Sequence, residues 1–176
     1  MVILKKILDF YINSSLHVAL SAFALVSMTQ YFFGVQGDFS VAFFAFFGTE
    51  VGYNFVKYDA IARLNKTEIK KELKVIVFLS FISLLACFYF FLQLSWMSKV
   101  SAFAFFGLTL LYTLPFFPNK QNARNWKGVK IYIVGITWVG VTVILPLVEA
   151  EITFSMDVLL MALQRFLLVF SIVLVF

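Results

Sequence analysis

The chain is organised as long apolar stretches separated by short polar segments. A helix of about 20 mostly apolar residues crosses the roughly 30 Å hydrocarbon core of a bilayer. Six stretches meet that requirement, at residues 13–33, 38–58, 73–94, 99–117, 129–148 and 157–176. None alternates apolar and polar residues with the period of two that is typical of a strand. The pattern therefore predicts an all-α, polytopic transmembrane bundle of six spans, in a single domain over residues 1–176.

The segments between the stretches carry residues that end helices. Gly34 and Gly37 separate the first two stretches, and Pro118 follows the fourth. Pro146 is expected near the end of a helix, where its missing amide hydrogen costs least.

Composition agrees with a lipid environment. Hydrophobic residues make up 62% of the chain and charged residues 13%, whereas soluble domains have about half and a quarter. A protein of 20.2 kDa cannot bury so much apolar surface in its own core. The net charge of +5 does not indicate nucleic acid, because the basic residues lie between apolar stretches and form no soluble basic face. The expected partner is the lipid bilayer.

The charges are distributed unevenly between the two ends of the stretches. Twelve of the 14 Lys and Arg residues precede the first stretch or lie in and around the connections 58–73 and 118–128. The remaining connections carry Asp38, Glu149 and Glu151. The positive-inside rule therefore predicts an inner or plasma membrane protein whose N-terminus and loops 58–73 and 118–128 are cytoplasmic.

A first group of polar residues lies on one face of the second stretch. Glu50, Asn54 and then Lys57 or Tyr58 follow helical spacings of three or four. Glu50 is expected about 18 Å below the outer end of its helix, at 1.5 Å per residue. A carboxyl at that depth faces protein or a water-filled cavity. Two interpretations stay open: a polar cavity that opens to the cytoplasm, or a hydrogen bond between helices.

Arg165 is the one basic residue well inside an apolar stretch. It is expected about 12 Å below the outer boundary, within side-chain reach of Glu50. We therefore predict a Glu50–Arg165 pair buried between the second and sixth stretches, with a structural role first. His17 and Cys87 are the only residues of their types, so they indicate packed side chains and no metal or disulfide site.

A second group follows the fourth stretch. Tyr112 precedes the Pro-bounded turn, and Lys120 and Arg124 come directly after it. Cations in such a loop can bind a phosphate group. They can equally contact anionic lipid headgroups, and the spacing alone favours this second interpretation.

Together the two groups resemble the UbiA-type intramembrane prenyltransferase superfamily. Asn54 matches the Asn that opens the first Asp-rich motif, while Tyr112, Lys120 and Arg124 match the Tyr and basic positions of the loop after the fourth span. The resemblance implies the first two-thirds of a nine-helix fold around a central cavity. It also implies transfer of an isoprenoid from its diphosphate to an aromatic or quinone-precursor acceptor, with Mg²⁺ as the usual cofactor.

The sequence departs from that family at the metal ligands. Phe55, Tyr58 and Ala62 stand where the resemblance implies Asp, and Asp59 is a weak candidate out of register. Mg²⁺ needs oxygen ligands, which these residues largely lack. Lys57, Lys120 and Arg124 offer positive charge for a diphosphate in place of the metal.

The last stretch ends in an apolar run with no polar residue to anchor it. We therefore expect a truncated chain that needs further C-terminal helices or a partner subunit and is inactive by itself. The alternative function is a non-catalytic, transporter-like or scaffold subunit of the membrane, whose buried charges only hold helices together.

Overall fold

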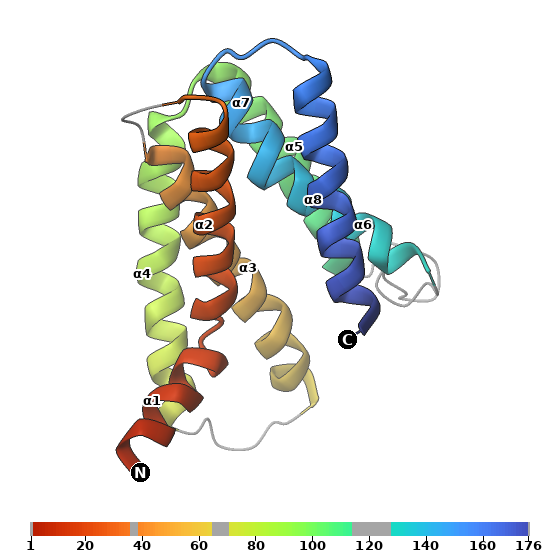
Figure 1. Cartoon of the computed structure of the whole chain (residues 1–176). Coiled ribbons are helices and arrows are strands. Elements are labelled where there is room, and N and C mark those ends of the chain that lie inside the picture. The colour runs from red at the N-terminus through yellow and green to blue at the C-terminus, as the bar shows by residue number, and fades with distance from the viewer. Residues whose placement is uncertain (1, 36–38, 65–70, 114–127, 176) are drawn as a thin grey trace.

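The computed structural model is built of helices joined by short connections (Figure 1). It describes residues 2–35, 39–64, 71–113 and 128–175, and no strand occurs in these ranges. The helices are α1 (Val2–Asn13), α2 (Leu16–Phe32), α3 (Ser40–Leu64), α4 (Lys71–Gln93), α5 (Trp96–Thr113), α6 (Val129–Val139), the π-helical turn η3 (Gly140–Ile144), α7 (Leu145–Glu149) and α8 (Met156–Val175). The predicted all-α class is confirmed.

The described part of each apolar stretch is largely helical, with the fifth stretch formed by α6, η3 and α7 in succession, but the helices differ in how well they suit a membrane. Three are long and apolar enough to cross one: Leu73–Gln93, Val129–Glu149 and Met156–Leu174. A fourth span results if the bent pair Ile3–Asn13 and Leu16–Phe32 counts as one. The remaining helices are less apolar or shorter, since α3 carries polar residues and the apolar part of α5 is Trp96–Leu111. The helices are thus compatible with an integral membrane protein.

A separate helix, α1, precedes the helix α2 that forms most of the first apolar stretch. α1 and α2 meet at an angle of 63°. The break falls at Ser14 and Ser15, and Ser15 takes a left-handed conformation with φ of 59°. α1 exposes apolar side chains such as Ile3 and Leu4 beside its two lysines, which suits a helix lying near a membrane surface.

The helices form two groups that are joined at one end (Figure 1). In the first group α3 packs between α2 and α4, and in the second α6 packs against α5 and α8. η3 and α7 join the groups by contacting α2, and α7 also contacts α3. A buried apolar cluster occupies this junction and includes Val26, Val41, Ala45 and Leu145. The junction is the main hydrophobic core of the molecule.

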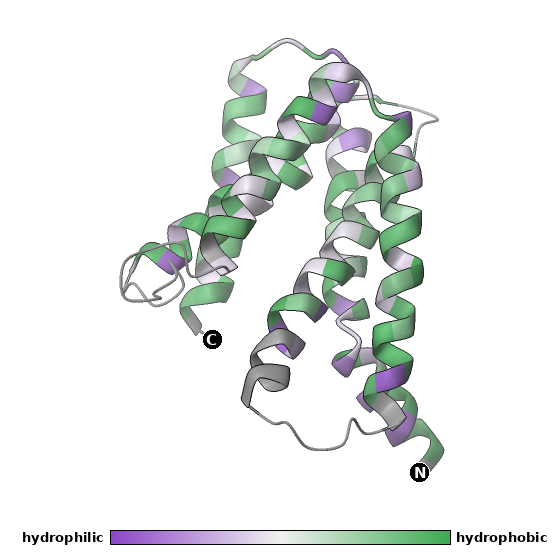
Figure 2. Ribbon diagram, turned by 180° about the vertical axis from the view of Figure 1, so that it is seen from behind, coloured by the Kyte–Doolittle hydropathy of each residue, from purple (hydrophilic) through white to green (hydrophobic). Residues whose placement is uncertain are grey.

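The outer surface is strongly apolar along the helices (Figure 2). α4 exposes Phe78, Phe81 and Phe88, and α8 exposes Leu163 and Leu167. Soluble monomers rarely expose apolar patches of this extent. Such a surface is compatible with lipid contact, because helices satisfy their own backbone groups and present only side chains outward.

The run from α6 to α7 is continuous but irregular. Pro146 lies in its last turns, as the sequence predicts, and has no amide hydrogen to donate to the carbonyl of Thr142. Just before it, the amide of Leu145 bonds the carbonyl of Gly140 in the π-helical pattern. Gly140 also lets α5 approach closely, because a Cβ there would lie 2.2 Å from the ring of Phe105.

Candidate functional site

A buried polar cluster lies between α3 and α4, and we call it the acidic cluster: Glu50, Asn54, Ser80 and Ser83. Glu50 is fully buried and Asn54 and Ser83 nearly so. The Asn54 amide donates to Glu50 Oε1 and, at 2.8 Å, to Ser80 Oγ. Ser80 in turn donates to Glu50 Oε1 at 3.3 Å. These hydrogen bonds join the two helices, as the second interpretation of Glu50 predicts.

Two oxygen atoms of the acidic cluster have no hydrogen-bond partner. They are Glu50 Oε2 and Asn54 Oδ1, and both are buried. Buried polar atoms are nearly always hydrogen-bonded in proteins, so an unpartnered pair on one helix face requires an explanation. Oε1 of the Glu50 carboxylate thus accepts two hydrogen bonds, whereas Oε2 accepts none.

A second polar centre joins α2, η3 and α8, and we call it the arginine node: Thr29, Thr142 and Arg165. The Thr29 hydroxyl lies 2.7 Å from the Thr142 carbonyl and 3.0 Å from the Leu25 carbonyl. Arg165 Nη2 donates to Thr29 Oγ1 and to the Leu25 carbonyl, both at 3.4 Å. Pro146 leaves the Thr142 carbonyl without its usual helical donor, so the Thr29 hydroxyl replaces that donor.

The predicted Glu50–Arg165 pair is not formed. Glu50 bonds residues of α3 and α4, whereas Arg165 bonds residues of α2. The free atoms of the two groups, Glu50 Oε2 and Arg165 Nη1, have no hydrogen-bond partner at all. The prediction was wrong because residue counting gives depth along a helix and says nothing of the direction in which the side chain points.

Lys57 and Tyr58 reach across to the break between α1 and α2. Tyr58 donates to the Asn13 carbonyl at 2.8 Å, and Lys57 Nζ donates to the same carbonyl at 3.2 Å. Asn13 ends α1, so its carbonyl lacks a donor within the helix. A cation suits this position, since the C-terminal end of a helix is partly negative. Among the described side chains, Lys57 therefore has a neutral partner and no acidic one.

The structure describes only part of the remaining predicted site residues. Tyr112 lies in the last turn of α5 and Asp59 in the C-terminal part of α3, but their side chains lie outside what the structure describes. Lys120 and Arg124 lie outside the described residues altogether. The end of α5 and the start of α6, which flank them, lie at the same end of the molecule as the end of α3 (Figure 1). Higher in the bundle, Trp138 Nε1 donates to the Tyr53 hydroxyl at 3.3 Å, which links α6 to α3.

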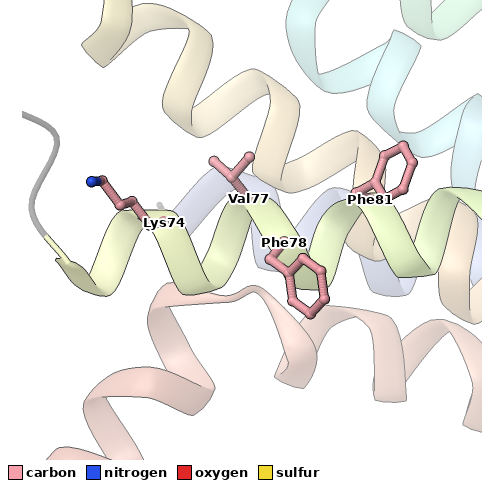
Figure 3. Close-up of a pocket in the computed structure, with 4 residues that line it drawn as sticks. All are labelled: Lys74, Val77, Phe78 and Phe81. Atoms are coloured by element: carbon pink, nitrogen blue, oxygen red, sulfur yellow. The ribbon is translucent and has the colours of Figure 1, made fainter.

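Two shallow hollows mark the surface, and both are apolar. One of about 390 Å³ runs along α4 beside Lys74, Val77, Phe78 and Phe81 (Figure 3). The other, of about 290 Å³, lies between α5, the α6–η3 run and α8, where Phe105, Gly140 and Phe166 are among the lining residues. Apart from Lys74 in the first hollow, neither lining offers a polar side chain to a soluble substrate. Both suit a hydrocarbon chain.

The described residues do not fit the Mg²⁺ site that the UbiA-type resemblance implies. They contain no group of three or more His, Cys, Asp or Glu side chains that could hold a metal ion. The carboxylate closest in sequence to Asn54 whose side chain is described is Glu50, and its Oε1 is already bonded to Asn54 and Ser80. His17 packs beside Tyr11, and Cys87 is partly buried near the Phe44 carbonyl.

Several functional contacts gave little signal in the sequence. Ser80 and Ser83 are spaced by three within an apolar stretch, which marks one polar helix face and could have been read as a partner for Glu50. Thr29 and Thr142 are 113 residues apart and carry no such signal. The same holds for Glu149, whose carboxylate accepts the Ser95 amide at 3.0 and 3.2 Å at the start of α5.

Fold and site together define a helical protein that has two buried ionisable centres and apolar helices compatible with a membrane. Comparisons with protein-family models, curated proteins and solved structures found no match to this chain. Its function is therefore argued from its own residues.

Proposed function

We propose that this chain is a divergent UbiA-type membrane protein that binds an isoprenoid diphosphate at its cytoplasmic end. The proposal takes its substrate class from the match of Asn54, Tyr112, Lys120 and Arg124 to the family motifs. One structural observation carries it further: the end of α3, the end of α5 and the start of α6 lie at one end of the molecule (Figure 1). Both candidate motifs therefore lie toward that end of the molecule, and the proposal requires that they act there on one ligand.

The same arrangement supports six spans with a cytoplasmic N-terminus. The connections 58–73 and 118–128 and the N-terminal lysines carry most of the positive charge. The helix ends that flank these segments lie toward the same end of the molecule in Figure 1, as alternating spans require. Glu149 and Asp157, which belong to the acidic connections, lie at or beside the opposite helix ends. Positive charge on one side favours the cytoplasmic face for that side.

The chemistry of this site would rest on cations. Lys57 is exposed and bonds the neutral oxygens of Asn13, and no carboxylate whose side chain the structure describes compensates its charge. With Lys120 and Arg124 it would neutralise the diphosphate, which stabilises the charge that develops on a leaving group. An apolar hollow such as the one lined by Phe105 and Phe166 suits the prenyl tail.

Binding of farnesyl diphosphate to the protein in lipid nanodiscs tests the proposal. We expect saturable binding with and without Mg²⁺, and at least tenfold weakening in Lys57→Ala, Lys120→Ala and Arg124→Ala. Lys99→Ala is the matched control, because Lys99 bonds the Leu92 carbonyl near the opposite helix ends, and its affinity should not change. Absence of saturable binding, or equal weakening in Lys99→Ala, would falsify the proposal.

A second candidate function is a non-catalytic scaffold or transporter-like subunit. It is favoured by the acidic cluster and the arginine node, whose hydrogen bonds run between helices and hold the bundle together. The two candidates differ in one measurement. If substitutions of Lys57, Lys120 and Arg124 alter thermal stability while farnesyl diphosphate never binds, the scaffold function is the correct one.

A further inference from the structure

The acidic cluster has a property that diphosphate binding does not use. Glu50 Oε1 accepts hydrogen bonds from Asn54 and Ser80, while Glu50 Oε2 has no donor at hydrogen-bond distance and the Ser83 hydroxyl faces the same carboxylate. The Asn54 amide must turn its nitrogen toward the carboxylate, because only the nitrogen can donate. Its oxygen Oδ1 is therefore left over, buried and without a donor. Two buried acceptors on one helix face lack a positive partner.

No described cation supplies that partner. Arg165 bonds α2, and Lys57 bonds Asn13. α4, which packs against this face of α3, presents the hydroxyls of Ser80 and Ser83 and no charge there. A buried carboxylate without a counter-charge is strongly unfavourable among apolar helices. A proton or a bound cation must therefore balance the charge of the Glu50 carboxylate.

The oxygen atoms of the acidic cluster indicate which class of cation would fit it. It consists of carboxylate, amide and hydroxyl oxygens from Glu50, Asn54, Ser80 and Ser83, which are hard ligands that suit alkali and alkaline-earth cations. The set carries a single negative charge. A monovalent cation makes the cluster neutral, whereas a divalent one would leave a net positive charge in apolar surroundings.

We propose that Glu50, Asn54, Ser80 and Ser83 form a binding site for one Na⁺ ion between α3 and α4. The ion accepts lone pairs from the two unpartnered oxygens, Glu50 Oε2 and Asn54 Oδ1, and ties the helices together. The site goes beyond diphosphate binding and shares only Asn54 with it.

Equilibrium binding of ²²Na⁺ to the purified protein, in choline buffer at one fixed pH, tests the site. We expect about one saturable site per chain, displaced by unlabelled Na⁺ and not by choline or Ca²⁺. Glu50→Gln should abolish binding, and Ser83→Ala should weaken it several-fold. Glu149→Gln is the matched control, because Glu149 bonds the Ser95 amide in another part of the bundle, and it should bind as the wild type does.

The test remains decisive if Glu50→Gln does not fold. Ser83→Ala keeps the carboxylate and loses one hydroxyl, so a monodisperse Ser83→Ala protein with unchanged Na⁺ affinity overturns the proposal. A monodisperse wild type without saturable ²²Na⁺ binding overturns it as well. Lys120→Ala should leave Na⁺ binding intact. Failure of this site and failure of diphosphate binding are therefore distinguishable.

Discussion

The acidic cluster and the arginine node bury opposite charges in the same bundle and stabilise them by different means. Around Glu50 the partners are side chains, namely the Asn54 amide and the Ser80 hydroxyl. Around Arg165 two of the acceptors are the Leu25 carbonyl and the Thr29 hydroxyl. A carboxylate needs donors, and helix backbones inside a bundle have none to spare. A guanidinium needs acceptors, and backbone carbonyls can accept a second hydrogen bond.

This difference explains why the two charges do not meet. Each bonds groups of a different helix, α4 for Glu50 and α2 for Arg165. The partner of each buried charge is therefore set by which helices pack beside it, and not by attraction between the two charges. The predictions below test that contrast.

The largest effect is expected from reversing each charge. Glu50→Lys forces a longer, positively charged side chain into the packed space between α3 and α4, and Arg165→Glu sets a carboxylate against the Leu25 carbonyl. Each buries a new charge without a counter-charge and should cost more than about 3 kcal/mol in unfolding by SDS titration. Glu50→Gln and Arg165→Gln are the neutral controls and should cost about 1 kcal/mol or less. Equal costs for reversed and neutral variants would contradict local stabilisation.

A smaller effect on stability is expected from adding a methyl group at a glycine, and it should differ between the two groups of helices. Gly140→Ala places a Cβ 2.2 Å from a carbon of the Phe105 ring, so α5 must shift, at a cost of about 1–3 kcal/mol. Gly52→Ala, in the other group, meets nothing within 4 Å and should be neutral or stabilising by up to about 1 kcal/mol. Thermal denaturation measures both. If Gly140→Ala is as stable as the wild type, the Phe105 ring can move to another rotamer without loss of packing.

The contribution of the Thr29 hydroxyl should be smaller again. Thr29→Val leaves the Thr142 carbonyl and Arg165 without their shared partner and should cost about 1–2 kcal/mol. Thr137→Val is the matched control, because the Thr137 hydroxyl bonds only the Ile133 carbonyl of its own helix. Its cost should stay below about 0.5 kcal/mol, the typical level for a substitution that breaks no critical contact. If both substitutions cost the same, the hydroxyl bridge between helices contributes nothing special.

The smallest expected effect is the coupling between the two centres. The double variant Glu50→Gln with Arg165→Gln should lose the sum of the single losses, within about 0.5 kcal/mol, because the two residues share no partner. A double-mutant cycle in SDS unfolding measures this coupling. A coupling above about 1 kcal/mol would restore the direct pair that the sequence predicts.

Much of the fold could be predicted from the sequence. Apolar stretches near 20 residues long specify helices, because a buried backbone must satisfy its own hydrogen bonds. The position of Pro146 near a helix end followed from its missing donor. The bend at Ser15 and the separate α1 could not be predicted in this way, because they depend on Tyr58 and Lys57 bonding the Asn13 carbonyl from a distant helix.

The candidate site was less predictable. Glu50 and Asn54 were placed on one helical face, and their direct hydrogen bond confirms that spacing. Their α4 partner Ser80 and the partners of Arg165 depend on which helices become neighbours. Substrate, orientation and the roles of Lys120 and Arg124 remain predictions.

The sequence by itself determined that the chain is helical, that its exterior is apolar and that its basic residues concentrate in a few segments. These properties are local, since each depends on residue type and on spacing along one helix. The tertiary structure alone decided which charge meets which partner. Partner choice depends on the rotation of each helix about its axis, and packing against neighbouring helices sets that rotation.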